Sequence, residues 1–192
     1  MVLIRKKDGT IRLCVDYRKL NKITRFDSYP MGNMEVMFTR LSNAKIFTKL
    51  DMSKGYYQIS LTEKSKPFTS FITPFGLFQW NVMSFGLVNA QATFNRMMGK
   101  LFSHREDVIY YLDDICIFCN TWEEHLKSLR DIFQILRDNN LTVKPSKIEI
   151  GLKEITFLGH RITNNSIKPL EETVTRILNI QIPKTKRRLE VY

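Results

Sequence analysis

The chain is poor in cysteine and has no long uninterrupted apolar run. Its 192 residues include three cysteines, an odd number without the spacing of a disulfide framework, which is typical of a reducing compartment. No apolar stretch reaches the roughly 18 residues of a membrane helix, and the apolar run in MVLIRKKDGT is too short for a signal peptide. We therefore expect an intracellular, non-secreted protein with no membrane partner.

Two of the cysteines, Cys116 and Cys119, form a C-x-x-C sequence that in other proteins binds metal. Here they lie in an apolar run that is typical of a strand, where positions three apart point to opposite faces. Joint ligation of one ion needs both thiols on the same side. We therefore predict that both cysteines pack in the core.

Acidic residues are also few: 19 Asp and Glu stand against 30 Lys and Arg, which gives a net charge of +11. This excess suggests a polyanionic partner, such as nucleic acid or an acidic membrane surface, although basic composition also serves solubility. Disorder does not explain the charge, because 43% of the residues are apolar and Phe and Tyr are frequent. The length suits about one domain, and the sequence contains no repeat or low-complexity linker.

Local patterns predict strands in the first third of the chain. Apolar alternation on both sides of Asp8-Gly9 predicts a β-hairpin with a basic tip. A strand is expected over 46–51, ending at an aspartate, and alternation that resumes through 57–61 predicts a further strand.

Two helices are predicted further along. The first covers 90–101, and the second covers 121–140 and begins with a capping box formed by Thr121 and Glu124. The apolar positions at helical spacing are Ala90, Phe94, Met97, Met98 and Leu101 in the first, and Leu126, Leu129, Phe133 and Leu136 in the second. Strand-like alternation returns over 141–163. This order predicts an α+β fold with helices packed on one side of an antiparallel sheet.

The stretch YYLDDICIF places Asp113 and Asp114 inside an otherwise apolar run. Strands over 108–112 and 115–118 would put both carboxylates in the turn between them, where Asp is an ordinary turn residue. The apolar flanks, however, place that turn near the core, where neighbouring carboxylates repel without compensation. A divalent cation would compensate them, with Asp51 as a candidate third ligand, and two such metals perform phosphoryl transfer.

The sequence resembles the reverse transcriptase domain in the Pol polyproteins of gypsy-class long-terminal-repeat retrotransposons and, more distantly, retroviral reverse transcriptases. Six blocks match in the order of the family and cover nearly the whole chain: RLCVDYRKLN, KLDMSKGYYQI, FQWNVMSFGLVNAQATFNRMM, YYLDDICIF, EEHLKSL and FLGHRI. The resemblance implies the fingers and palm of a right-hand polymerase, an α+β fold whose antiparallel palm sheet is backed by helices. It also implies that the chain is shortened at both ends, with most of the thumb missing.

The resemblance divides the chain into parts. Residues 1–25 and 59–89 would be fingers-like, 26–58 and 90–165 palm-like, and 166–192 the start of the thumb. The run of lysines and arginines in KTKRR would be a solvated first turn of a thumb helix, or alternatively a nuclear-import-like cluster. Two departures stand out, because Ser84 and Gln91 replace prolines that the family usually has, which would leave the loop less rigid.

The resemblance also assigns the catalytic residues. Asp51, Asp113 and Asp114 would be the catalytic aspartates and hold two Mg²⁺ or Mn²⁺ ions, with the carbonyl of Met52 completing one shell. The residues implied to bind the incoming nucleotide are Lys6, Arg12, Lys54, Gly55, Tyr56, Phe85, Gly86 and Tyr111.

Some of these residues have specific implied roles. Tyr56 would exclude a ribose 2′-hydroxyl by its rigid ring. Alternatively it is a core aromatic beside Tyr57, since strand neighbours point to opposite faces.

The block FLGHRI implies a primer grip made of Phe157, Leu158, Gly159 and His160. Gly159 would let the backbone approach a sugar-phosphate chain closely. Taken alone, His160 is better explained as an ordinary surface or core histidine.

The resemblance implies an RNA-directed DNA polymerase that adds dNTPs to a primer 3′-hydroxyl on an RNA or DNA template. Protease, RNase H and integrase segments of the polyprotein would lie outside this chain, and its location would be element particles in the cytoplasm or the nucleus. One alternative is an inactive remnant that at most binds nucleic acid. Another is an RNA-dependent RNA polymerase, against which Tyr56 and the order of the blocks count.

Overall fold

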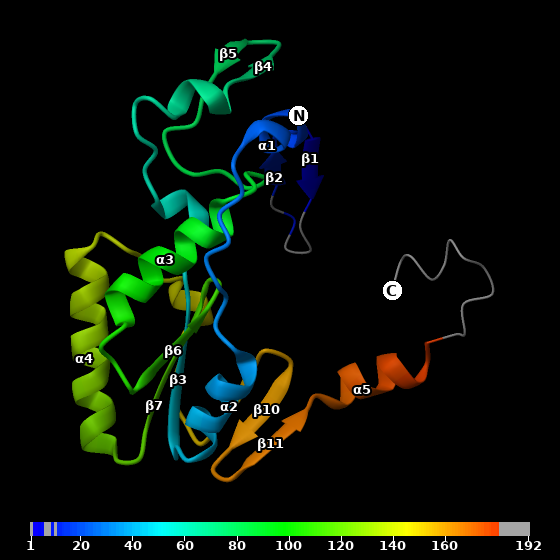
Figure 1. The fold of residues 1–192 in the computed structure, drawn as a ribbon. Coiled ribbons are helices and arrows are strands. Elements are labelled where there is room, and N and C mark those ends of the chain that lie inside the picture. The colour runs from blue at the N-terminus through cyan, green and yellow to red at the C-terminus, as the bar shows by residue number, and fades with distance from the viewer. Residues whose placement is uncertain (1, 6–8, 10, 181–192) are drawn as a thin grey trace.

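The computed structural model describes residues 2–5, 9 and 11–180 of the chain (Figure 1). Its centre is a four-stranded antiparallel sheet in the order β6-β7-β3-β8, called the central sheet below. Its strands are β3 (Ile46–Asp51), β6 (Val108–Tyr111), β7 (Asp114–Cys119) and β8 (Glu149–Leu152). The predicted strand that ends at Asp51 is therefore confirmed.

Helices α3 (Ala90–Phe102) and α4 (Trp122–Asp138) cover one face of the central sheet (Figure 1). Residues of β7 alternate between the two faces: Ile115 and Ile117 pack in the core under these helices, whereas Cys116 and Phe118 pack on the other side. The side chains that α3 and α4 bury there include Phe94, Met98, Leu129, Ile132 and Leu136. The predicted α+β class is confirmed.

The other face of the central sheet is covered as well. Helix α2 (Met34–Ser42) packs there together with a three-stranded sheet of β9 (Glu154–Phe157), β10 (His160–Thr163) and β11 (Ser166–Pro169). Helices thus lie on both sides rather than on one. The short α1 (Arg18–Ile23), α2, β11 and α5 (Glu171–Leu178) were not among the predicted elements, and each spans nine residues or fewer.

The second long helix, α4, begins as its sequence predicts. Thr121 accepts a hydrogen bond from the Glu124 amide, and the Glu124 carboxylate accepts one from the Thr121 amide, which completes the capping box. One detail of its predicted apolar face is wrong, because Leu126 is exposed while His125 is fully buried. The buried stripe runs one position earlier, through 125, 129, 132 and 136.

His125 links this helix to the central sheet. Its Nε2 lies 2.7 Å from the Thr48 hydroxyl of β3, and the same hydroxyl oxygen accepts a hydrogen bond from the Gly151 amide of β8. One buried contact therefore joins α4, β3 and β8. Because β3 continues to Asp51, this contact also helps to fix where that strand ends.

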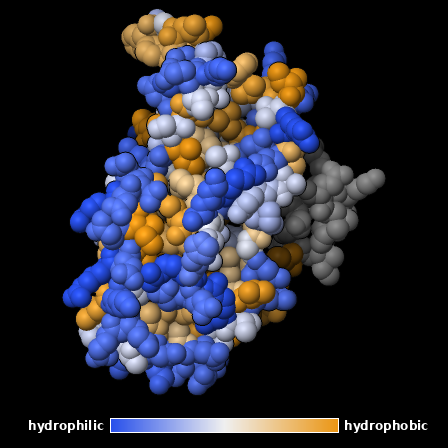
Figure 2. Space-filling model, turned by 60° about the vertical axis from the view of Figure 1, so that its left-hand side comes forward, coloured by the Kyte–Doolittle hydropathy of each residue, from blue (hydrophilic) through white to orange (hydrophobic). Residues whose placement is uncertain are grey.

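The upper part of the molecule in Figure 1 contains two hairpins, α1 and connecting segments. Strands β1 (Val2–Arg5) and β2 (Ile11–Cys14) pair antiparallel, which confirms the N-terminal hairpin, although residues 6–8 and 10 of its tip lie outside the described residues. The second hairpin pairs β4 (Phe71–Thr73) with β5 (Gly76–Phe78). It leaves large apolar side chains exposed, which Figure 2 shows at its upper end.

The strand expected over 57–61 is absent. Residues Gly55–Gln58 form a 3-10 helix, followed by an isolated bridge from Ser60 to Val82. The alternation of apolar residues there belongs to a tight turn whose two tyrosine rings both pack on Phe85, not to an extended segment. Two further short 3-10 helices, Lys66–Thr69 and Pro145–Lys147, connect the remaining elements.

No helix among the described residues is long and apolar enough to cross a membrane. All three cysteines are free, and Cys116 and Cys119 are buried, as the sequence predicts. Cys116 and Cys119 are three positions apart on β7, and Cys119 is its last residue, so their thiols point to opposite faces. They therefore do not form a shared ligand pair.

Candidate functional site

Neighbouring strands bring Asp51 and Asp114 side by side at one end of the central sheet. Asp51 of β3 lies directly opposite Asp114 of β7, and Tyr111 of β6 lies opposite Asp114 on its other side. The turn from β6 to β7 therefore consists of Leu112 and Asp113 alone. The prediction that Asp114 lies in the turn is wrong, because the hairpin closes with two residues and Asp114 begins the strand.

This turn has an unusual backbone that is tied to the end of β3. Leu112 has a φ of 53°, a left-handed conformation that is rare for a bulky side chain. The carbonyl of Asp113 accepts a 2.8 Å hydrogen bond from the amide of Met52. A Cβ at Gly55 would lie 3.5 Å from the Cβ of Asp113. The turn, the end of β3 and the 3-10 helix thus form one connected unit, and backbone strain of this kind concentrates at functional sites.

Two lysines contact the aspartates. The ammonium of Lys147 lies 2.6 Å from the carboxylate of Asp51, and that of Lys49 lies 3.5 Å from the carboxylate of Asp114. Sequence reasoning missed both lysines. Lys49 is two residues before Asp51 on the same strand, so the period of two would have placed them on one face. Lys147 is 96 residues away from Asp51 in the sequence, and no local pattern could have paired them.

The pKa values of Asp114 and Lys147 indicate that the lysines compensate the negative charge of the aspartates only in part. Burial raises the pKa of Asp114, and the nearby Asp113 and Asp51 raise it further, while Lys49 lowers it. The hydrogen bond to Asp51 raises the pKa of Lys147. A carboxylate that remains harder to ionise despite a lysine beside it marks a place where additional positive charge would be favourable.

The donors fit a hard divalent cation in their chemistry. No three His, Cys, Asp or Glu side chains among the described residues converge as ready-made ligands. The carboxylates of Asp51 and Asp113 and the carbonyl of Met52 nevertheless belong to one backbone-bonded unit, and Mg²⁺ and Mn²⁺ prefer such oxygen donors. Lys147 contacts one of these donors, so it occupies part of the space around Asp51 that a cation would share.

Tyr56 lies in the 3-10 helix next to this unit. Its ring packs against Phe85 at 5.1 Å and against Phe94 at 5.7 Å between centroids. Burial raises the pKa of its hydroxyl, and the charge of Asp113 adds to that shift. The argument that Tyr56 and Tyr57 point to opposite faces is wrong, because the segment is not a strand and Tyr57 also packs against Phe85.

Other residues implied to bind nucleotide surround Tyr56. Lys54 has a φ of 56° and precedes the buried Gly55, so the chain turns sharply there. Gly86 has a φ of 93°, and a Cβ at this position would lie 3.3 Å from the carbonyl of Val15. The glycine therefore lets this loop approach the segment after β2. The structure brings Tyr56 and Phe85 together.

The basic residues of the N-terminal hairpin are described only in part. Lys6 lies outside the described residues, so its predicted role stays a prediction. The backbone of Arg12 lies in β2 opposite Ile4, while its side chain is not among the described ones.

The residues of the implied primer grip form a tight hairpin. Leu158 and Gly159, with φ of 48° and 74°, make the turn between β9 and β10. Phe157 is fully buried, and the ring of His160 packs on Phe38 of α2 at 4.6 Å. Leu158 packs against the same core cluster as Tyr111. The hairpin and Tyr111 therefore share one face of the central sheet.

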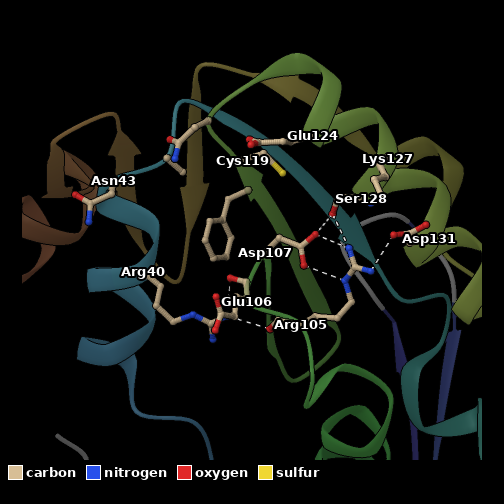
Figure 3. A pocket seen from close by; sticks show the side chains of 13 residues that line it. Arg40, Asn43, Arg105, Glu106, Asp107, Cys119, Glu124, Lys127, Ser128 and Asp131 are labelled. Carbon is tan, nitrogen blue, oxygen red and sulfur yellow. Dashed lines mark hydrogen bonds and ion pairs between the residues drawn. The ribbon is translucent and has the colours of Figure 1, made fainter.

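A cavity of about 490 Å³ lies at the opposite end of the central sheet (Figure 3). Arg105 pairs there with Asp107 and with Asp131, and the Ser128 hydroxyl donates to Asp107. The hydrogen bonds from Arg105 and Ser128 hold the pKa of Asp107 below its usual value, although burial opposes them. Within this cavity, Arg105 therefore compensates the charge of Asp107 and contacts Asp131 as well.

Comparison with known proteins places the chain within one family. The model for "Reverse transcriptase (RNA-dependent DNA polymerase)" matches residues 4–162. The chain belongs to this family, as its sequence motifs predict.

The chain is similar to polyproteins of transposons. Over 183 residues the chain is 39% identical to the retrovirus-related Pol polyprotein from transposon 297 of Drosophila melanogaster, which aligns 94% of the chain and 17% of that polyprotein. Over 194 residues it is 29% identical to the transposon Tf2-3 polyprotein of Schizosaccharomyces pombe, covering 100% of the chain and 15% of the relative. The chain thus spans less than a fifth of the length of these relatives.

Solved structures share the same fold. The foamy viral protease-reverse transcriptase dRH in complex with double-stranded DNA superposes with a TM-score of 0.88 at 28% identity, over 98% of this chain and 33% of that one. The foamy viral protease-reverse transcriptase in complex with an RNA/DNA hybrid gives 0.83 at 28% identity, over 98% and 26%. The predicted fingers and palm are confirmed, and the central sheet is the palm sheet.

Proposed function

We propose that the chain catalyses template-directed transfer of nucleotides from dNTPs to a primer 3′-hydroxyl, with RNA as a template. The observation that carries this proposal is the alignment of Asp51 and Asp114 across β3 and β7, with Asp113 in the turn beside them. An isolated pair of aspartates in a turn would be ordinary. Three of them at one sheet end, in a member of this family, support phosphoryl transfer.

Asp51, Asp113 and the Met52 carbonyl would hold the two Mg²⁺ or Mn²⁺ ions. When bound, these ions supply charge stabilisation to the reacting phosphate and lower the pKa of the attacking hydroxyl. The protein itself contributes position: the hydrogen bond from Met52 to Asp113 fixes the turn against β3. Asp114 adds negative charge next to these donors without taking part in the turn.

The aromatic cluster around Tyr56 would select the sugar of the incoming nucleotide. Its contacts with Phe85 and Phe94 hold the ring in one orientation, which a steric filter requires. Backbone amides near Lys54 and Gly55, and the basic residues Lys6 and Arg12, would bind the triphosphate. Phe85 and Gly86 would lie under the nascent base pair.

The nucleic acid would lie across the two hairpins and the central sheet. Solved relatives in complex with double-stranded DNA and with an RNA/DNA hybrid support a duplex partner. Residues 157–160 would hold the primer end, and the net charge of +11 would favour phosphate contacts. The logarithm of the binding constant should then fall linearly with the logarithm of the salt concentration, with a slope of roughly −0.9 per contacted phosphate on B-form DNA.

The subdomain boundaries at 25, 58, 89 and 165 and the location in element particles or the nucleus form part of the same proposal. The boundary at 165 lies in the turn of the β10–β11 hairpin, so the thumb-like part would begin with a strand of the β9–β11 sheet. Protease, RNase H and integrase activities would belong to other segments of such a polyprotein.

One observation favours a second candidate, a nucleic-acid-binding module without turnover. Lys147 already neutralises Asp51, and the described carboxylates do not converge as a finished metal site. Such a module would keep the fold and the basic surface but would not add nucleotides.

Primer extension separates the two candidates. Purified chain is incubated with an RNA template, a DNA primer, Mg²⁺ and either dNTPs or rNTPs, alongside Asp113→Asn. We expect metal-dependent dNTP incorporation that Asp113→Asn loses, with little use of rNTPs. A folded wild-type chain that binds the duplex but never extends it, also when lengthened at both ends, would establish the second candidate. Equal use of rNTPs would contradict the assignment of Tyr56.

A further inference from the structure

His125 is a buried titratable group that has no role in the proposed polymerase chemistry. It lies in the first turn of α4, and its side chain is fully buried. Its Nε2 is 2.7 Å from the hydroxyl oxygen of Thr48 in β3, and that oxygen also accepts a 3.1 Å hydrogen bond from the amide of Gly151 in β8. The imidazole therefore attaches the start of α4 to two strands of the central sheet.

The hydrogen bonds of this contact suit a neutral imidazole. The Thr48 hydroxyl has one proton and two lone pairs, and the Gly151 amide uses one of the lone pairs. A neutral ring either accepts the hydroxyl proton at Nε2 or donates to the second lone pair. The Nδ1 atom of His125 is buried without a hydrogen-bond partner among the described residues. A protonated ring carries N–H groups at both nitrogens, so it would bury a charged donor that has no acceptor.

Trp122 adds a second contact between the same turn of α4 and β8. Its ring stacks on that of His125, with 5.8 Å between centroids and 25° between planes. The indole also lies over Gly151, where a Cβ would be 2.7 Å from its Cη2 atom. The φ of Gly151 is 68°, so glycine permits both this backbone conformation and the close approach of the indole. The imidazole and the indole thus form one unit that joins the first turn of α4 to the sheet.

The surrounding charges do not offset a proton on this ring. Asp107 is the carboxylate whose charge favours protonation of His125, but it already accepts hydrogen bonds from Arg105 and Ser128. Burial outweighs this charge and lowers the pKa of His125. The positive end of the α4 dipole also disfavours a cation in the first turn. The charged residues of the elements around the ring are paired elsewhere or exposed: Lys49, Asp51, Asp114 and Glu149 on the strands, and Glu124 and Lys127 on α4.

We propose that His125 is an acid-sensitive latch: protonation of its ring detaches the first turn of α4 from β3 and β8, so that the fold opens locally at this contact. The folded pKa of His125 lies below the unfolded value of about 6.5, so the latch is fully closed above that pH and is lost progressively as the pH falls below it. Since Thr48 lies on the strand that ends at Asp51, opening would also loosen that strand. The inference is independent of the proposed function, because it concerns a contact that binds no substrate.

Hydrogen exchange of the backbone amides tests the latch in the full chain without any catalytic step. Mass spectrometry follows exchange in the first turn of α4 at about pH 6.5 and about pH 5.5, on either side of which the unfolded ring changes its charge, with correction for the intrinsic exchange rate. The test variant is His125→Gln, whose amide can still bond to Thr48 but does not titrate in this range. His104→Gln, which replaces an exposed histidine, is the matched control.

In the wild type we expect the opening constant of these amides to rise about fivefold from about pH 6.5 to about pH 5.5. This is the increase for one proton taken up on opening by a ring with a pKa of about 6.5 in the open form. The control should follow the wild type, and His125→Gln should show no increase. An equal increase in His125→Gln, or constant protection in the wild type, would overturn the proposal.

Direct observation of the imidazole provides a second measurement, which decides if melting shows that His125→Gln is not folded. Nuclear magnetic resonance of the chain with ¹⁵N-labelled histidine follows the three rings, and His104→Gln and His160→Gln assign them. We expect the His125 ring to stay neutral as long as the amides of α4 are protected. Protonation of this ring at about pH 6.5 with α4 still protected would overturn the proposal.

Discussion

The two ends of the central sheet both carry acidic side chains, and they compensate them differently. At one end Asp107 receives hydrogen bonds from Arg105 and Ser128, and its pKa lies below its usual value (Figure 3). At the other end Asp114 has a raised pKa with Lys49 3.5 Å away, and the backbone next to it is strained at Leu112. A self-neutralised cluster stabilises the fold, whereas an under-compensated one is available to bind a cation or a substrate.

The largest difference between the two ends should appear in activity. Asp51→Asn removes a carboxylate that would hold metal, so we expect nucleotide incorporation to fall by about a hundred- to a thousandfold or more. Asp107→Asn, at the other end, should keep the wild-type rate per folded molecule. Single-turnover primer extension with melting curves for each variant measures both. Similar losses of rate in the two variants would remove the distinction between the ends.

Stability should show the reverse order. Asp107→Asn loses charge-assisted hydrogen bonds in a partly exposed cluster, and we expect a loss of about 1–2 kcal/mol in the free energy of unfolding at pH 7. The folded pKa of Asp107 is lower than its unfolded value, so its contribution is present above about pH 4 and is lost as pH falls through the folded pKa. Urea denaturation between about pH 3 and pH 7, a range that spans the unfolded pKa, should therefore show a free energy of unfolding that depends less on pH in the variant than in the wild type. An identical pH profile would contradict this assignment.

The sequence predicted the parts of this picture that depend on local signals. The capping box of α4 and the strand ending at Asp51 are local patterns, and both are confirmed. The position of Asp114 was mispredicted, because the turn places a leucine in a left-handed conformation that no turn propensity favours. The Lys147–Asp51 contact joins segments far apart in the chain, so only tertiary structure reveals it.

Other features could not be predicted from the sequence because they too depend on tertiary contacts. Tyr57, Ile59 and Leu61 alternate with polar residues as a strand would. Residues Gly55–Gln58 nevertheless form a 3-10 helix in which Tyr56 and Tyr57 both pack on Phe85. Periodicity reports burial along one element, whereas these sites depend on which elements meet.

A smaller effect is expected from removing the lysine that contacts Asp51. Lys147→Ala frees a carboxylate from a partly exposed ion pair, and such pairs contribute up to about 1 kcal/mol. We therefore expect Mn²⁺ to bind about two- to fivefold more tightly in the variant. Isothermal titration with Mn²⁺ measures this, with Lys153→Ala as a control of equal charge change. Unchanged or weaker binding in Lys147→Ala alone would show that Lys147 does not compete with the cation.

The smallest expected effect is that of Asp114, at the turn end of the central sheet, on the stability of the fold. The raised pKa of Asp114 means that the folded chain keeps this proton to higher pH than the unfolded chain, so ionisation lowers stability as pH rises above about 4. Asp114→Asn removes that cost, and we expect an equal or slightly higher melting temperature at neutral pH. Differential scanning calorimetry at acidic and neutral pH measures it. A clear loss of stability would show that Asp114 is compensated as fully as Asp107.

The central claim is that the turn end of the sheet holds divalent cations and the opposite end does not. The most direct measurement is Mn²⁺ binding followed by electron paramagnetic resonance for wild type, Asp113→Asn and Asp107→Asn. We predict that Asp113→Asn weakens binding by about tenfold or more, while Asp107→Asn binds as wild type does. Equal affinity of wild type and Asp113→Asn, with the loss confined to Asp107→Asn, would contradict the account.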